Sequence, residues 1–336
     1  MRQGRCRMKK RQNRLSEGQM PEIDIHTDDY ALTVNTSKDI LECMKTGSLD
    51  SISIMPNMSC TEECVMMLYK IIPDLPFLPK MSVHLNFVEG QCLTRPEEIP
   101  YLTRQGEQMM GLSWGGLFWL SYLPWKRYEA KKQLKKEIKA QIEAAWKVVR
   151  KCMEIAKVHG IPCMQKELRI DSHQHVHMIP VVWEALTEVI FEENYRVEYI
   201  RNSKEVLGAF LADLSLWKTY QPINFIKNRL LSLYSYKVER YARAHSMMQM
   251  YFWGLIMSGH MDYDRIVRLY RGVTAKAEKN RRTLEISFHV GSTLPEEVTK
   301  EIGETAARNF YLKPDRQVER ETVMKLRKFA ETGPLI

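Results

Sequence analysis

The chain has 336 residues, of which 44% are hydrophobic, and its formal net charge is +9. Most of this excess lies in residues 1–19, which hold seven Lys or Arg against one Glu. The remaining residues are nearly neutral, which argues against a protein that binds nucleic acid through its phosphates. The basic head lacks the apolar stretch of a secretory signal. We expect residues 1–19 to be disordered, and residues 20–336 to form a single domain.

Seven cysteines are scattered without a CxxC pair, a pattern typical of reduced thiols in a cytoplasmic protein. The longest uncharged stretch, 109–125, is interrupted by glycine and is too short to cross a bilayer. We therefore expect a cytoplasmic protein without a membrane span.

Apolar periodicity predicts strands that alternate with helices along most of the chain. Alternation of this kind is typical of right-handed βαβ units and of a parallel sheet or barrel. Residues 205–280 interrupt the pattern, and we interpret them as a mostly helical insertion or cap. Strands are expected within 22–32, 51–57, 80–87, 166–175, 195–202 and 284–291, and helices within 37–50 (with Ser37 as N-cap), 60–75, 128–158 and 180–194.

Ionisable side chains follow four of the predicted strands. Functional groups of α/β proteins gather at the carboxyl ends of parallel strands, so we expect these side chains to lie close together. They are Asp28 and Asp29, His84, His173 and His289.

Each of these positions also has an ordinary structural explanation. A lone histidine such as His84 is more often a hydrogen-bonded core residue, and an Asp-Asp pair is more often a turn or cap. Their combination favours function, because one Asp and two His from separate strands can hold a metal with open positions for water and substrate. In a carboxylate doublet, one member can bind the cation and the other can accept a proton from water.

The run His173-x-His175-x-His177 has a period of two, which would place three imidazoles on one face of an extended chain. Beyond the strand end this periodicity lapses. We therefore expect His175 and His177 to support the site or the fold, and Asp171 either to orient an imidazole or to bond within its strand.

Three segments carry a resemblance to a known family: TDDYALT (27–33), SVHLNF (82–87) and IDSHQHVHMIP (170–180). In this order they resemble the YdjC-like carbohydrate deacetylases of the ChbG/HpnK group, and the resemblance extends from about residue 22 to 325. It implies a TIM-like, irregular β/α barrel of the deacetylase type that holds one divalent cation, magnesium or zinc.

The resemblance also implies roles for single residues. Asp29, His84 and His173 match the metal ligands of the family, and Asp28 matches its catalytic base. His289 matches the residue that protonates the leaving amine, although Val290 stands where the family usually has proline. Ala31 stands where glycine is common. Arg201 and Asn57 match residues near the substrate.

The expected reaction is removal of an N-acetyl group from an amino sugar or chito-oligosaccharide, with release of acetate. A metal-dependent hydrolase of phosphoesters or non-sugar amides is one alternative, and an inactive carbohydrate-binding relative is another. Whether two copies of the chain form a homodimer is left open. An aromatic cluster at 114–125 is expected in a loop, where it more readily forms a buried core or a dimer contact than a sugar platform.

Overall fold

The computed structural model describes residues 22–104, 107–302 and 305–332, so the basic head lies outside the described residues. Seven parallel strands form one sheet in the order β5-β4-β3-β2-β1-β7-β6. The strands are β1 (Ile23–Tyr30), β2 (Ser51–Ile54), β3 (Lys80–Leu85), β4 (Leu168–Ser172), β5 (Val197–Ile200), β6 (Tyr251–Trp253) and β7 (Leu284–Phe288).

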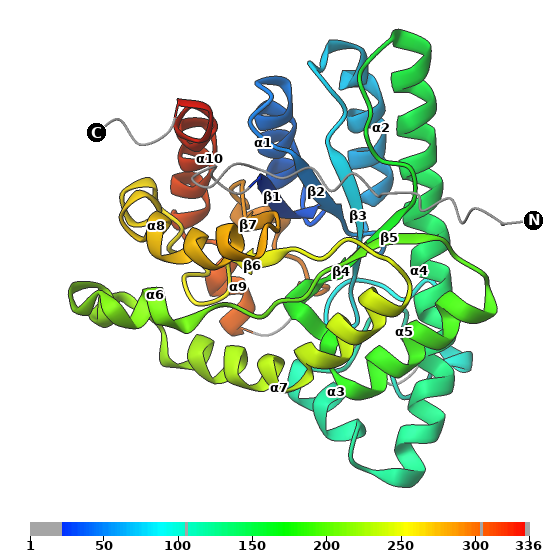
Figure 1. The fold of residues 1–336 in the computed structure, drawn as a ribbon. Coiled ribbons are helices and arrows are strands. Elements are labelled where there is room, and N and C mark those ends of the chain that lie inside the picture. The colour runs from blue at the N-terminus through cyan, green and yellow to red at the C-terminus, as the bar shows by residue number, and fades with distance from the viewer. Residues whose placement is uncertain (1–21, 105–106, 303–304, 333–336) are drawn as a thin grey trace, which may run out of the picture.

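The sheet curls, and helices surround it (Figure 1). Its two edges approach each other through one parallel bridge between Tyr199 of β5 and Met248, which precedes β6. Nearly all strand residues are buried, as expected for parallel strands with helices on their outer face. This arrangement confirms the predicted irregular β/α barrel.

Helices connect the strands and cover the outside of the barrel. The long helix α4 ends at Gly160, whose φ of 69° is the left-handed conformation that glycine adopts easily. The helices are α1 (Val34–Lys45), α2 (Thr61–Ile71), α3 (Trp114–Leu120), α4 (Pro124–His159), α5 (Pro180–Glu192), α6 (Leu207–Ala212), α7 (Pro222–Ala244), α8 (Tyr263–Asn280), α9 (Thr305–Tyr311) and α10 (Asp315–Thr332), with short 3-10 turns at η1 (Ile72–Asp74), η2 (Pro96–Glu98), η3 (His173–Met178), η4 (Leu214–Thr219) and η5 (Pro295–Glu297).

Three local expectations were wrong. The first helix begins one turn earlier than predicted, because Thr33 rather than Ser37 accepts the backbone N–H of Thr36 as its N-cap. The predicted aromatic loop contains helix α3, which begins at the N-cap Ser113. Residues 205–280 are not all insertion, since they include strand β6 and helix α8 of the barrel itself.

Strand β6 escaped prediction because it has only three residues, Tyr-Phe-Trp, too few to show a period of two. It pairs in parallel with β7 at the edge of the sheet. The insertion is therefore limited to α6, η4 and α7, which lie beside one end of the barrel (Figure 1).

We predict that Gly291→Ala lowers the free energy of unfolding by about 1–3 kcal/mol, because its φ of +102° is strained for any residue with a Cβ. A Cβ would also lie 2.7 Å from the backbone oxygen of Thr36. Gly208→Ala is the matched control, since a Cβ there meets open space. Urea denaturation measures both variants, and equal stability of the two would contradict this account of the turn.

Candidate metal centre and active site

The carboxyl end of β1 is bent, and the bend brings two adjacent carboxylates to one place. Asp29 has a φ of 68° and Ala31 a φ of 73°, and the pairing of β1 with β2 shifts register between Thr27 and Tyr30. In a regular strand, neighbouring side chains point to opposite faces. Here both members of the doublet contact His84, one through each of its ring nitrogens.

Asp29, His84 and His173 meet at the carboxyl ends of three strands. Asp29 Oδ1 lies 3.1 Å from His173 Nδ1 and 3.5 Å from His84 Nε2. One possible ligand atom from each residue lies within 4.8 Å of the others, and all three side chains are buried. The structure thus brings together the three residues that the sequence singled out as candidate ligands.

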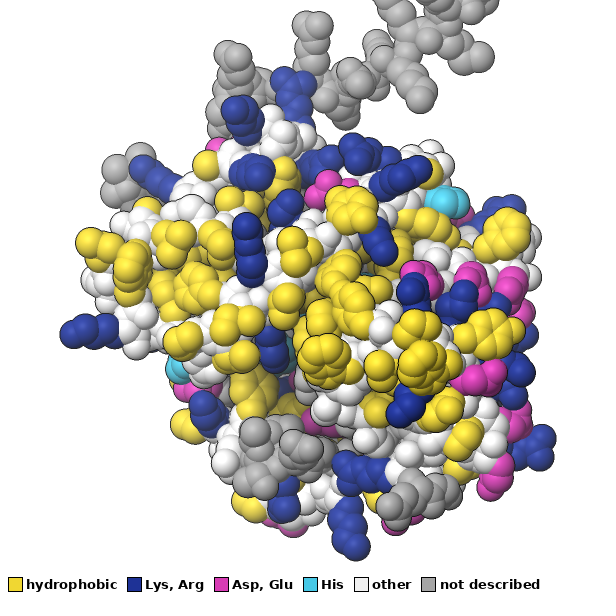
Figure 2. Space-filling view, turned by 90° about the horizontal axis from the view of Figure 1, so that it is seen from below, with side chains coloured by type: hydrophobic (Ala, Val, Ile, Leu, Met, Phe, Trp, Pro, Cys, Tyr) yellow, Lys and Arg dark blue, Asp and Glu magenta, His cyan; other side chains and the backbone are white. Residues whose placement is uncertain are grey.

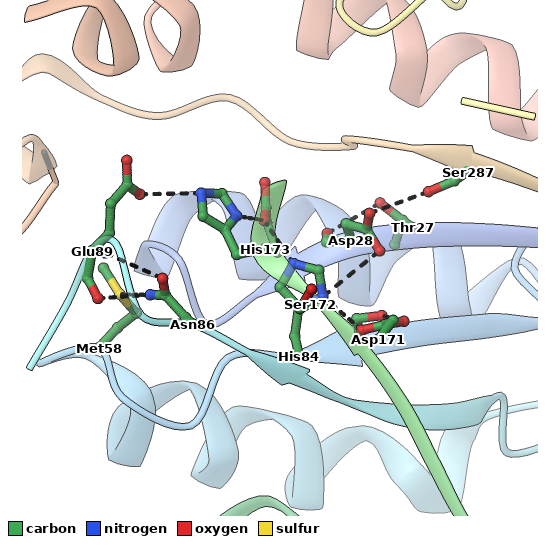
Figure 3. A network of polar contacts seen from close by, with 12 residues as sticks. Thr27, Asp28, Met58, His84, Asn86, Glu89, Asp171, Ser172, His173 and Ser287 are labelled. Atoms are coloured by element: carbon green, nitrogen blue, oxygen red, sulfur yellow. Dashed lines mark hydrogen bonds and ion pairs between the residues drawn. The ribbon is translucent and has the colours of Figure 1, made fainter. Parts of the chain in front are cut away.

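Each of these three side chains also forms a hydrogen bond or an ion pair with a further polar side chain. Asp171 Oδ1 lies 2.7 Å from His84 Nδ1 (Figure 3). His84 Nε2 is therefore the ring nitrogen that faces Asp29. Arg316, at the start of α10, binds the outer oxygen of Asp29 at 3.2 Å. Orientation of this kind is typical of protein metal sites.

His173 is oriented from the loop after β3 and from α9. Its Nε2 lies 3.0 Å from the hydroxyl of Tyr311 and 3.4 Å from a carboxylate oxygen of Glu89. The Tyr311 hydroxyl also donates to Glu89 at 2.8 Å. His173 Nδ1 is therefore the ring nitrogen that faces Asp29.

The charge of the site favours a cation. Burial alone would lower the pKa of His84, but Asp28 and Asp171 raise it to about 9. In the same way, Glu89 and Asp29 overcome burial and raise the pKa of His173 to about 10. The carboxylates thus stabilise positive charge between the two imidazoles, where a divalent cation would replace the protons. The donor set of two imidazoles and one carboxylate fits a metal.

Asp28 lies beside this cluster and is fixed by Arg201. The guanidinium Nη1 is 2.9 Å from Asp28 Oδ1, and Ser287 Oγ donates to Oδ2 at 3.2 Å. Burial alone would raise the pKa of Asp28, but chiefly Arg201 holds it well below its usual range. Asp28 is therefore ionised, which is the state a general base requires, while its lowered pKa makes it a weaker base than an ordinary carboxylate.

A second group of possible ligands, His26, Asp28 and Asp171, is less suited to a metal. Arg201 already contacts both carboxylates, at 2.9 Å and 3.1 Å, and supplies the positive charge that they require. A cation placed there would be repelled by the guanidinium.

A cavity of about 700 Å³ opens above the cluster, a volume in the usual range for small-ligand sites. Asp28, His84 and His173 line its base, and residues of α3, α7 and α9 line its walls. The cavity is also lined by His175, His289 and Ile223.

Neither predicted substrate residue lies on the wall of this cavity. Arg201 is 0% exposed and also binds Glu285 at 2.6 Å, so it positions carboxylates instead. Asn57 is buried, and its amide donates to the backbone oxygens of Glu89 and Gln91. We therefore expect Asn57 to order the loop that carries Glu89, and neither residue to contact substrate.

His289 lies on the cavity wall directly after β7. Its backbone N–H donates to Glu319 at 2.6 Å, while its ring Nδ1 has no hydrogen-bond partner among the described residues. Val290, which replaces the usual proline, donates its backbone N–H to Thr27 Oγ1 at 3.0 Å. Proline could not make this bond, so the substitution adds a fixed contact without removing the turn.

The other two histidines of the run separate because the chain turns into η3. Gln174 and His175 both have a positive φ, of 50° and 59°, so the period-two pattern ends with the strand, as expected. His177 turns inward, where its Nε2 lies 2.7 Å from the backbone oxygen of Arg201. His175 lines the cavity, with Nδ1 2.8 Å from Ser203 Oγ.

Glu89, Tyr311 and Arg316, which contact the candidate ligands, were not predicted from the sequence. Glu89 follows the SVHLNF segment closely, so its place near His84 could have been inferred. Tyr311 and Arg316 lie more than a hundred residues beyond the histidine run and carry no local signal.

Comparison with known proteins identifies the family. Residues 22–152 and 168–330 match the family described as YdjC-like protein. A carbohydrate deacetylase of Thermoanaerobacter pseudethanolicus is 34% identical over 24% of this chain and 30% of its own length. A chitooligosaccharide deacetylase of Proteus mirabilis is 26% identical over 55% of this chain and 62% of its own length. The matches thus span less than two thirds of either relative.

Among solved structures, a protein of Enterococcus faecalis V583, proposed to cleave cellobiose phosphate, superposes with a TM-score of 0.54. The superposition covers 93% of this chain and 95% of the other, at 17% identity, and so supports the fold alone. The family match extends over most of the sequence and includes every strand that contributes to the cluster. The chain therefore belongs to the YdjC-like protein family.

Proposed function

We propose that the chain is a metal-dependent carbohydrate deacetylase that hydrolyses the N-acetyl group of an amino sugar or chito-oligosaccharide. The observation that supports this most strongly is the cluster of Asp29, His84 and His173 at the base of a cavity, with the ionised Asp28 beside it. The names of the two curated relatives point to the same reaction.

The residues of the site have different roles in the proposed reaction. A divalent cation held by Asp29, His84 and His173 would acidify a water molecule and offset the negative charge that develops on the acetyl oxygen. Asp28 accepts the proton of the water that attacks the acetyl carbon. His289, which lines the cavity, donates a proton to the departing amine. The C–N bond breaks, and acetate and the free amino sugar are released.

Two histidines and one carboxylate are a ligand set that suits zinc. Magnesium prefers oxygen ligands and several waters, and it would find only one protein oxygen among these three side chains. We therefore expect zinc or another transition metal to bind more tightly than magnesium.

The reaction is tested by acetate release from chito-oligosaccharides, measured beside hydrolysis of generic phosphoesters with the same preparation. We expect stoichiometric metal, acetate release from the sugars, loss of turnover on chelation, and recovery when the cation is returned. Phosphoester hydrolysis without acetate release would favour the alternative hydrolase. Metal and sugar binding without turnover would indicate an inactive relative.

The two aspartates can be distinguished by asparagine substitution. Asp28→Asn should keep the metal, because Asp28 is outside the ligand set, and turnover should fall by roughly 10²–10⁴, the usual contribution of a general base. Asp29→Asn should weaken metal binding, and excess cation should partly restore its rate.

Metal content, rate and thermal stability are measured on both variants. Stability is included because Asp28→Asn removes one partner of the buried Arg201. Loss of metal from Asp28→Asn together with full metal in Asp29→Asn would reverse the assignment of the two residues.

A further inference from the structure

Apolar and aromatic side chains gather on the face formed by α3, the start of α4, α6, η4 and α7. Figure 2 shows these side chains spread over the surface seen from below, with basic side chains among them and acidic ones mainly near one edge. We call this the aromatic-basic face. Its exposed apolar members are Trp119, Tyr122, Leu123, Trp125, Tyr128, Leu211, Leu214, Trp217, Ile223, Ile226, Leu233 and Tyr236.

Most of these side chains are at least half exposed. Trp125 is 75% exposed and Trp119 is 66% exposed, which argues against the buried-core alternative for the aromatic cluster and leaves the dimer contact untested. The corner between α3 and α4 is joined to α7 by a contact between the hydroxyls of Tyr122 and Tyr234. The parts of the face are therefore held together rather than separate.

Helix α7 is apolar on its outward side. Ile226, Leu233 and Tyr236 are exposed and follow one another at spacings of seven and three residues, so they form one stripe away from the barrel. Three exposed arginines lie on the same side of the helix: Arg229, Arg240 and Arg243. At a membrane interface, exposed apolar side chains can insert among the lipids while neighbouring arginines bind anionic headgroups.

The positive charge of this face is not neutralised. Residues 207–244 contain six Lys or Arg against two acidic residues, Asp213 and Glu239. Asp213 already pairs with Arg268 on α8, and no described residue forms an ion pair with Arg229, Arg240 or Arg243. On the flank between α4 and α5, by contrast, lysines pair with glutamates, among them Lys131 with Glu188 at 2.7 Å and Lys139 with Glu193 at 2.7 Å.

We propose that the aromatic-basic face docks on the surface of an anionic phospholipid membrane. Tryptophan and tyrosine favour the boundary between headgroups and acyl chains, and each Lys or Arg near an anionic surface adds to binding. No helix among the described residues is long and apolar enough to span a bilayer, so the contact is peripheral. Ile223 belongs to both the face and the cavity wall, so docking places the cavity entrance beside the headgroups.

A second copy of the chain fits this face less well. In a symmetric pair the same patch meets itself, so the unpaired arginines would approach one another with almost no acidic partners. A phospholipid surface supplies the missing negative charge.

The proposal is tested by sedimentation of the metal-loaded full-length protein with phosphatidylcholine vesicles, with and without phosphatidylglycerol. We expect binding to the anionic vesicles, weaker binding at high salt, and a blue shift of tryptophan fluorescence on binding. The triple variants Arg229→Glu/Arg240→Glu/Arg243→Glu and Trp125→Ser/Ile226→Ser/Leu233→Ser should each lose about tenfold or more in affinity. None of these six residues lines the cavity.

The matched control is Val158→Ser/Met164→Ser/Phe191→Ser, which removes apolar side chains elsewhere that are at least as exposed, and it should bind vesicles normally. Deacetylation of a soluble sugar should be unchanged in every variant, so this test is independent of the proposed reaction. Absence of vesicle binding, or equal binding by all variants, overturns the proposal. A dimer in sedimentation velocity that the same substitutions dissociate, without vesicle binding, assigns the face to a second copy instead.

Discussion

The buried guanidinium of Arg201 is the interaction on which the active end of the barrel depends. It contacts Asp28, Asp171 and Glu285, which belong to three different strands. Three carboxylates in this volume would repel one another strongly without a buried positive charge. Arg201 thus allows Asp28 to remain ionised, and it fixes the carboxylate that orients His84.

Two groups of carboxylates lie close together at this end of the barrel, and they differ in how far arginine neutralises their charge. Arg201 satisfies the inner group of carboxylates, so a metal is not needed there. Farther out, Asp29 is bound by Arg316 through one oxygen only, and its other oxygen faces the two histidines. In the proposed reaction the outer group would bind the cation, and the inner group would supply Asp28 as the proton acceptor.

Much of this site could be predicted from sequence because it depends on which residues directly follow the predicted strands. Parallel strands end at one edge, so polar residues that follow strands converge, as Asp29, His84 and His173 do. The roles of Arg201 and Asn57 could not be predicted, since a matching position does not reveal whether a side chain points inward or toward substrate. Arg316 and Tyr311 could not be found either, because their approach depends on how α9 and α10 return to the barrel.

The same reasoning explains what was missed in the fold. Strand β6 is too short to show a pattern, and it is recognised only through its pairing with β7. The exposed aromatic residues of α3 and α4 were interpreted as a buried core or a dimer contact, because large apolar side chains are usually covered. Sequence alone does not show that the outward side of α7 is apolar as well.

The central claim is that one cation binds between Asp29, His84 and His173. Anomalous diffraction from crystals grown with zinc tests it most directly, because the position of the metal is observed without reference to activity. The account predicts one strong peak about 2.0–2.2 Å from an oxygen of Asp29, from Nε2 of His84 and from Nδ1 of His173. A peak between His26, Asp28 and Asp171, or no peak among the three proposed ligands, would contradict it.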